Sequence, residues 1–216
     1  MEQSGPKPDG LAEYRARVVA EKRAAAMDAA IDLFLTNGYD HTTLEQVAKS
    51  AGISSATVYK HFPTKAALFG GIMSRLWENE PEHLPAMPAP GNPRQGLLAV
   101  GRAYASLLLR DQTVALFRVV TAEAPRFPEL GQELYERGKK PYLDRLRIYL
   151  EREISAGTLK INDIPLAKRQ FLGMINDVVF WPRLLIVNLK ISKKDADIVV
   201  REAVETFLRR YSRRKN

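Results

Sequence analysis

The 216-residue sequence contains no cysteine and only three histidines. Disulfides, thiolate catalysis, cysteine zinc sites and cysteine redox sensing are therefore excluded. His41, His61 and His83 include no pair at helical metal-ligand spacing, so we predict no metal and no cofactor. A glycine-rich phosphate loop and a convincing pair of carboxylates are also missing, which argues against an enzyme. The nearest candidate, Glu123 near Arg126, is more typical of a surface ion pair.

Long hydrophobic runs are absent as well. No window of about 18 residues is both apolar and uncharged, so no membrane-spanning helix and no membrane partner are expected. The first ten residues, MEQSGPKPDG, are polar and do not form a signal peptide. We therefore expect a cytoplasmic protein. Alternating β-branched runs are scarce, whereas helical periodicity recurs from about residue 14 to the end, which predicts an all-α fold of about nine helices.

The net charge of +8 makes nucleic acid a reasonable partner, but the charge is unevenly distributed. Residues 1–65 carry eight basic and eight acidic side chains, and the basic excess lies downstream. Bulk charge therefore does not locate a nucleic-acid site, and local patterns have to do so.

Local signals divide residues 12–76 into four helices. The first is expected over about 12–37 and stops at Gly38. The second is predicted to be capped by Thr42, which stands at capping-box spacing from Glu45, and to end at Gly52. Ser54 then caps a short third helix that ends near Phe62 and Pro63, and Thr64 caps the fourth.

Residues 81–93 contain five prolines and are predicted to form a linker or long loop. Pro93, capped by Asn92, suits the first turn of a new helix. Further helices are expected at roughly 93–110, 113–124, 128–156, 164–189 and 193–212, with kinks at Pro141 and Pro182. These signals favour two parts, an N-terminal arm with a three-helix domain over residues 1–66 and a helical bundle over residues 67–216.

The short turn Gly52-Ile53-Ser54 between two helices predicts a helix-turn-helix. Val58 and Phe62 are spaced to pack inward. The residues left facing outward suit a major groove, because small side chains allow close approach and hydroxyl, methyl and ammonium groups can read base edges. The candidate base contacts are Ser55, Ala56, Thr57 and Lys60. A helix–glycine–helix turn also occurs in ordinary all-α proteins, so this pattern alone leaves both interpretations open.

Hydroxyl, phenol, imidazole and ammonium groups around this turn form a second set. Lys65 opens the fourth helix, where a bound phosphate would meet both the ammonium and the helix N-terminus. The hypothesis requires that these side chains share one exposed surface. The candidate phosphate contacts are Thr42, Thr43, Tyr59, His61 and Lys65. Upstream, an arm carrying Arg15, Arg17, Lys22 and Arg23 either enters a minor groove or is a solvated helix face.

The segment GYDHTTLEQVAKSAGISSATVYKHFPTKAALF resembles the N-terminal domain of the TetR family of bacterial transcription regulators. The resemblance covers about 50 residues and is carried by Gly38, Thr42, Thr43, Val47, Ala48, Ala51, Gly52, Ile53, Ser54, Thr57, Val58, Tyr59, His61, Phe62 and Lys65. It implies phosphate contacts from Thr43, Tyr59, His61 and Lys65, and base readout from Ser55, Ala56, Thr57 and Lys60. The sequence departs from the family pattern at Ala56, and Lys60 occupies a variable position.

The C-terminal stretch FRVVTAEAPRFPELGQELYERGKKPYLDRLRIYLEREISAGTL is similar to the AefR-like branch of the same family. This resemblance implies a bundle with an internal cavity for an unknown small-molecule effector, and a homodimer formed by two late helices. Apolar helix faces that carry a few polar atoms are typical of small-molecule pockets. The same helical spacing of apolar residues is also typical of an ordinary hydrophobic core. The candidate pocket residues are Phe69, Met73, Trp77, Tyr104, Leu108, Phe117, Val120, Glu123, Met174, Asn176, Phe180 and Trp181.

Wide apolar faces on the helices near 165–189 and 193–212 are expected to pack across a two-fold axis. The candidate interface residues are Leu172, Ile175, Val178, Val179, Ile198, Val199, Ala203, Val204 and Phe207. The expected function is a ligand-responsive regulator that binds a palindromic double-stranded operator as a dimer and is released by a small molecule; the family's habits favour a repressor. Two alternatives stay open, a helical-bundle enzyme and a nonspecific DNA-binding protein.

Overall fold

The computed structural model describes residues 8–78 and 89–213, and the chain is all-α over these ranges, as predicted. Nine of the α-helices there have seven or more residues. The one β pairing among the described residues is a single bridge between Leu159 and Ser212. Most of the predicted loop 81–93 lies outside the described residues.

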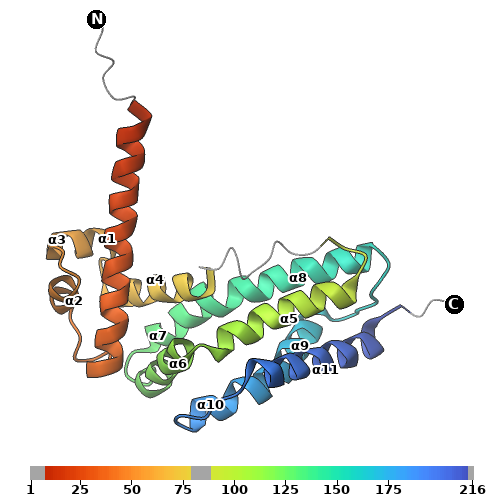
Figure 1. Cartoon of the computed structure of the whole chain (residues 1–216). Coiled ribbons are helices and arrows are strands. Elements are labelled where there is room, and N and C mark those ends of the chain that lie inside the picture. The colour runs from red at the N-terminus through yellow and green to blue at the C-terminus, as the bar shows by residue number, and fades with distance from the viewer. Residues whose placement is uncertain (1–7, 79–88, 214–216) are drawn as a thin grey trace, which may run out of the picture.

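The N-terminal part, called the head below, consists of α1 (Pro8–Asn37), α2 (Leu44–Ser50) and α3 (Ser55–His61). In Figure 1, α1 is a long helix whose first half projects beyond α2 and α3, and α4 (Lys65–Glu78) leads from the head toward the rest of the chain. The predicted start near residue 12 was therefore too late. Gly38 ends α1 in a left-handed conformation, with φ of 82°.

The remaining helices form the body. They are α5 (Pro93–Leu109), α6 (Asp111–Glu123), α7 (Pro128–Glu133), a π-helical turn η1 (Leu134–Lys139), α8 (Lys140–Ser155), α9 (Ile164–Val179), α10 (Trp181–Leu185) and α11 (Lys193–Tyr211). Figure 1 shows the axes of α5, α8 and α11 extending in the same general direction from the head, with the chain of α5 running back toward the head and those of α8 and α11 running away from it. As predicted, Asn92 caps α5 through a hydrogen bond from the Gln95 amide, and Pro93 occupies its first turn.

Both prolines for which a kink was predicted stand in the first turn of a helix, each next to an irregular stretch. Pro141 is the second residue of α8, just after the π-helical turn, where the missing N–H of a proline is tolerated. Pro182 stands just after the break at Phe180 that separates α9 from α10. The predicted helix 164–189 is thus two helices, and it ends at Leu185.

The head contacts the body through the turn between α6 and α7. The Tyr39 side chain is 1% exposed, and its ring packs edge-on against Phe127 at a centroid distance of 5.2 Å. Arg126 donates to the Asp40 carboxylate at 2.8 Å. Phe69 of α4 completes this junction, with its ring centroid 6.1 Å from that of Tyr39. The orientation of the head therefore depends on residues of both parts.

Most of the apolar periodicity in α9 and α11 faces the core of this chain. Six of the nine candidate interface residues are buried inside this single chain, so they cannot contact a second copy: Leu172, Ile175, Val179, Ala203, Val204 and Phe207. Val199 is half-buried, whereas Val178 and Ile198 are exposed. That prediction is wrong for the six buried side chains, because a helix face that packs within the bundle has the same period as one that packs between chains.

No helix among the described residues combines the length and the apolarity needed to cross a membrane.

Candidate nucleic-acid interface

The α2–turn–α3 unit is built by local caps. Thr43, and not Thr42, caps α2: its hydroxyl accepts from the Gln46 amide at 3.2 Å, and the Gln46 side chain accepts from the Thr43 amide at 2.8 Å. The capping box is therefore one residue later than predicted. Gly52 has φ of 65°, the left-handed conformation that the tight turn requires. Ser54 caps α3 as predicted.

The outward face of α3 matches the pattern expected of a recognition helix. Val58 and Phe62 are buried as predicted, at 0% and 2% exposure. Ser55, Ala56 and Lys60, three of the candidate base contacts, are exposed. The fourth, Thr57, is half-buried, and its hydroxyl lies 2.8 Å from that of Ser54.

Tyr59 is exposed but already has a partner. Its hydroxyl donates to the Glu45 carboxylate at 2.6 Å. This hydrogen bond lowers the pKa of Glu45 and raises the pKa of Tyr59. A phosphate that takes the Tyr59 hydroxyl must therefore replace a carboxylate, and Glu45 is an acidic side chain on the same surface that sequence reasoning treated only as a cap.

Lys65 is turned inward, contrary to the prediction. Its ammonium donates to the backbone carbonyls of Tyr39 at 2.6 Å and Asp40 at 3.1 Å, and lies 4.3 Å from the centre of the Tyr39 ring. Burial lowers its pKa despite nearby carboxylates. Lys65 and Tyr59 thus do not share one exposed surface here, and Lys65 connects α4 to the end of α1.

Thr42 is the second correction. Its side chain is 1% exposed, and its hydroxyl donates to the Gly38 carbonyl at 2.8 Å. A buried, satisfied hydroxyl cannot contact a phosphate. Thr43 is exposed, and its hydroxyl accepts at the cap and hydrogen-bonds the Glu45 carboxylate, so a phosphate has to compete with Glu45 for it as well.

A basic cluster lies where α1 meets the end of α3, and we define it as Lys22, Arg23, Lys60 and His61. The Arg23 guanidinium lies 5.3 Å from the centre of the Phe62 ring, which joins the two helices. Partial burial, followed by the charges of Arg23, Lys60 and Lys22, lowers the pKa of His61. Sequence reasoning assigned Lys22 and Arg23 to a separate arm, because only the packing of α1 on α3 brings them to His61.

The rest of the arm is a solvated helix face in this structure. Arg17 pairs with Glu21 at 3.6 Å, and both side chains are about two-thirds exposed. Arg15 is exposed too, together with the apolar Leu11 and Tyr14.

Three of the twelve candidate pocket residues come together in the body. The Trp77 and Tyr104 rings lie 6.4 Å apart, and the Tyr104 hydroxyl donates to Asn176 Oδ1 at 3.2 Å. Tyr142, which was not among the candidates, packs against both rings at tilted angles, with centroid distances of 6.0 Å and 5.2 Å. Its position could have been suspected from its spacing along α8, but not its contact with α4.

Three other candidates lie away from these rings. Phe69 belongs to the head–body junction described above. Glu123 is beside Gly38, at the same junction, where a Cβ on the glycine would lie 3.6 Å from the carboxylate. Trp181 is 49% exposed on α10.

The other candidates are apolar packing residues of the body. Phe117 meets Phe180 edge-on at 4.8 Å, and Met174 is partly buried. Met73, Leu108 and Val120 are buried. Among the residues that the structure describes, no group of three or more metal-ligating side chains is placed to hold a metal ion.

Two family models match the chain. Residues 26–72 match the model of bacterial regulatory proteins of the TetR family, and residues 95–213 match the C-terminal domain of AefR-like transcriptional repressors. The second match alone spans more than half of the chain. The chain belongs to the TetR family of bacterial transcriptional regulators. Both resemblances stated from the sequence are thereby confirmed, and the matched proteins are regulators rather than enzymes.

Individual regulators are similar to this chain over most of their length. The regulator TcmR of Streptomyces glaucescens is 33% identical over 154 residues, which cover 69% of this chain and 67% of that protein. The structure of the flavonoid-responsive regulator FrrA superimposes with a TM-score of 0.73 at 27% identity, covering 91% of this chain and 100% of that one. A TetR regulator from Agrobacterium tumefaciens gives 0.72 at 25% identity, covering 90% and 96%.

Proposed function

We propose that this TetR-family regulator is a repressor that binds a palindromic operator as a homodimer and leaves it when a small molecule binds the body. The observation that supports this best is the head: a capped helix-turn-helix whose second helix exposes Ser55, Ala56 and Lys60, with the basic cluster at its end. A helix of that size enters a major groove, and flanking cations hold its register on the phosphates.

The phosphate contacts in this proposal come from Thr43, Tyr59 and the basic cluster. Within residues 8–78 and 89–213, no acidic side chain forms an ion pair with Lys22, Arg23 or Lys60, so their charge is available to a phosphate. Tyr59 exchanges Glu45 for a phosphate oxygen on binding. Lys65 and Thr42 are left out of the contact set because their polar atoms are engaged inside the protein.

The dimer surface in this proposal is centred on α10 and the residues after it. In this segment a charged side chain is buried, whereas apolar side chains face the solvent. Arg183 is 4% exposed and donates inward to the Leu108 carbonyl and Asp111, both at 2.6 Å. Leu185, Ile186 and Val187 face solvent at 75%, 56% and 67% exposure. Monomeric proteins rarely expose a contiguous apolar patch of this kind.

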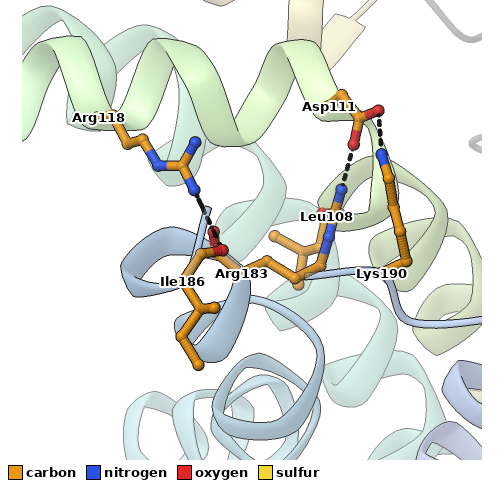
Figure 2. A network of polar contacts seen from close by, with 6 residues as sticks. All are labelled: Leu108, Asp111, Arg118, Arg183, Ile186 and Lys190. Carbon is orange, nitrogen blue, oxygen red and sulfur yellow. Dashed lines mark hydrogen bonds and ion pairs between the residues drawn. The ribbon is translucent and has the colours of Figure 1, made fainter. Parts of the chain in front are cut away.

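Polar contacts hold that patch rigidly in place. Figure 2 shows Arg118 of α6 reaching the carbonyls at the end of α10, and Lys190 and Arg183 converging on Asp111. The Arg118 guanidinium donates to Arg183 O at 2.6 Å and to Leu184 O at 3.0 Å. A preorganised surface loses little entropy on association. Val178, Trp181 and Ile198 are further exposed apolar residues of α9, α10 and α11, and the proposal counts them with this patch, because a two-fold interface uses the same surface on both copies.

The effector response in this proposal links the body to the head through the α6–α7 turn. Two recognition helices fit a palindrome only when they are about one turn of DNA apart, roughly 34–36 Å. A ligand that shifts α4 or α6 moves the junction formed by Tyr39, Phe127 and Asp40 with Arg126, and so changes that spacing. To empty an operator it has to favour the released state by several kcal/mol. The structural relative FrrA is described as flavonoid-responsive, which supports a response to a small aromatic molecule.

A footprint of the purified full-length protein on the DNA that flanks its own gene tests the proposal. One protected palindrome, occupied by two copies per site in analytical ultracentrifugation, is the expected result. Diffuse protection would favour a nonspecific DNA-binding protein, and the absence of any protection at low salt would contradict DNA regulation altogether.

A further inference from the structure

Basic side chains gather where the end of α11 meets the loop after α8, and the proposed function does not use them. We define them as the distal cluster, which consists of Lys160, Arg209, Arg210 and Arg213. All four residues are exposed. Figure 1 shows the end of α11 and the loop after α8 at the end of the body farthest from the head. Part of the basic excess of the sequence therefore lies away from the recognition helix.

Backbone hydrogen bonds bring the distal cluster together from two segments of the chain. The Lys160 amide donates to the Tyr211 carbonyl at 2.8 Å, and the Arg213 amide donates to the Thr158 carbonyl at 3.1 Å. Leu159 separates Thr158 from Lys160 and is 1% exposed. Because successive side chains of an extended segment point to opposite sides, Lys160 projects into the solvent. The backbone pairing therefore holds the charges of both segments on one preorganised surface.

The charge of the distal cluster is not neutralised within the part of the chain that the structure describes. No acidic side chain of residues 8–78 or 89–213 forms an ion pair with any of its members. Glu205, one helical turn before Arg209, pairs with Arg94 instead. The carbonyls at the end of α11 offset part of the charge, but a helix C-terminus carries only about half an elementary charge. Four cations therefore leave a positive surface, which favours an anionic partner.

The composition of the distal cluster favours a nucleic-acid backbone over a lipid surface. Three of its four members are arginines, whose planar fork of donors matches the oxygens of a phosphate. No large apolar side chain of residues 149–163 or 199–213 is exposed, so none is available to enter a bilayer. Stable attachment to a membrane usually requires such a second signal besides charge. Duplex DNA requires only cations, because it presents a continuous line of phosphates.

We propose that the distal cluster is a second DNA-binding surface, which binds the backbone of a duplex other than the operator without reading its sequence. The inference rests on the proposed function and extends it, because a regulator held on its operator by the head then holds a second duplex at the other end of the body. Binding through phosphates alone is weak and strongly dependent on salt.

Capture of a second duplex by the operator-bound protein tests the proposal. The full-length protein is bound to an immobilised operator, a duplex that it selects from a random library, and a labelled duplex of random sequence is added at about 50 mM salt. The distal variant combines Lys160→Ala, Arg210→Ala and Arg213→Ala. We expect it to bind the labelled duplex about 10-fold more weakly than the wild type does, with a salt slope smaller by about 0.9 for each phosphate no longer neutralised. Its affinity for the operator should be unchanged.

A matched variant shows whether position or total charge decides the result. Arg145→Ala with Lys193→Ala and Lys194→Ala also removes three exposed cations of the body, all outside the distal cluster. This control variant should capture the labelled duplex as the wild type does, and both variants should unfold in urea at the wild-type midpoint. Equal capture by the wild type and the distal variant, or equal losses in the two variants, would overturn the proposal.

The remaining outcomes separate this inference from the proposed function and from a lipid partner. A protein that selects an operator but captures no second duplex disproves the role of the distal cluster alone. Binding of the wild type, but not of the distal variant, to phosphatidylserine vesicles without capture of DNA would assign the cluster to a lipid surface instead. A protein that selects no operator disproves the proposed function. The two variants are then compared on the random duplex alone, where the distal variant should still bind more weakly than the control variant.

Discussion

The cations of the head and the apolar residues of the body can be compared in one respect: in both regions, the sequence pattern alone does not tell which side chains are available to a partner. Lys65 occupies the position where a phosphate contact is expected, yet its ammonium is held by two backbone carbonyls and two aromatic rings. Lys22 and Arg23, from a different helix, lie next to His61 at the end of the recognition helix. The position of a charge in a motif therefore does not tell whether the charge is available.

In the body, the apolar side chains that follow a helical pattern differ in exposure from those that do not. Val179 and Val204 belong to the regular stripes of α9 and α11 and are fully buried within the chain. Leu185 and Val187 belong to no stripe and are exposed beside the buried Arg183. In both regions, the groups available to a partner are those left over once the chain has satisfied its own contacts. The predictions below test that rule.

The largest effect is expected at the exposed apolar patch. Leu185→Glu should turn a dimer into a monomer, because a glutamate buried at the two-fold axis lacks a partner, at a cost of about 3 kcal/mol or more. Operator affinity should then fall by about 100-fold. Sedimentation velocity and a gel-shift titration measure the two effects.

Ile148→Glu is the matched control for that variant. Ile148 is an exposed apolar residue of α8, outside the patch, and is 39% exposed. The control should remain a dimer with unchanged DNA binding. A Leu185→Glu protein that stays dimeric would assign the dimer to another face.

A smaller effect is expected when the basic cluster is deprived of its α1 members. The double variant Lys22→Ala with Arg23→Ala should bind operator about 10-fold more weakly at moderate salt. The slope of log affinity against log salt should fall by about 0.9 for each phosphate that the variant no longer neutralises. Arg17→Ala, on the same helix but paired with Glu21, is the control and should change neither quantity. Equal slopes for the double variant and the wild type would restrict the phosphate contacts to α3.

Lys65 is expected to affect stability rather than charge neutralisation. Lys65→Met leaves the carbonyls of Tyr39 and Asp40 without their donor, which should lower the free energy of unfolding by about 1 kcal/mol after allowance for partial exposure. The salt dependence of DNA binding should stay that of the wild type. Urea unfolding and gel shifts at several salt concentrations check both statements. A reduced salt slope would return Lys65 to the phosphate contacts.

The local structure of the head could be predicted because its signals lie within a few residues of each other. Gly38, Gly52 and Ser54 act on their own turns, and all three were predicted correctly. The error at the α2 cap is one residue. The Thr42 side chain is buried and turned back to the Gly38 carbonyl, whereas the exposed Thr43 lies where its hydroxyl accepts from the Gln46 amide. Both threonines satisfy the sequence rule for a cap, and the rule does not tell which of them turns back toward α1.

The candidate pocket and the dimer surface depend on contacts between segments that are far apart in the sequence. Helical spacing within one segment does not predict such contacts. Trp77 and Tyr104 were named, but so was Trp181, because spacing along a helix does not distinguish an inward from an outward ring. Arg183 could not be predicted as buried from its charge. Its burial follows from the break at Phe180, which redirects α10 so that Arg183 faces Leu108 and Asp111.

The smallest expected effect is a pH dependence of operator affinity. It arises from His61, the one member of the basic cluster that titrates near neutral pH. In the free protein, partial burial and the charges of Arg23, Lys60 and Lys22 lower the pKa of His61 below its ordinary value of about 6.5. A phosphate bound beside it would raise that pKa, because an adjacent anion favours the imidazolium. Binding then takes up a proton, and the affinity for operator rises as the pH falls from about 8 to about 6, by at most a factor of ten per pH unit for one proton.

The lowered pKa of His61 in the free protein gives the folding stability a pH dependence opposite to that of DNA binding. This opposite dependence serves as the control. A lowered pKa in the folded state means that the unfolded chain binds the proton more readily, so the contribution of His61 to stability is lost as the pH falls through and below about 6.5. Gel shifts and urea unfolding over this range should therefore move in opposite directions. His61→Gln should flatten both profiles, whereas His41→Gln, on the exposed turn before α2, should flatten neither. An affinity that does not depend on pH in the wild type would place the imidazole away from the phosphates.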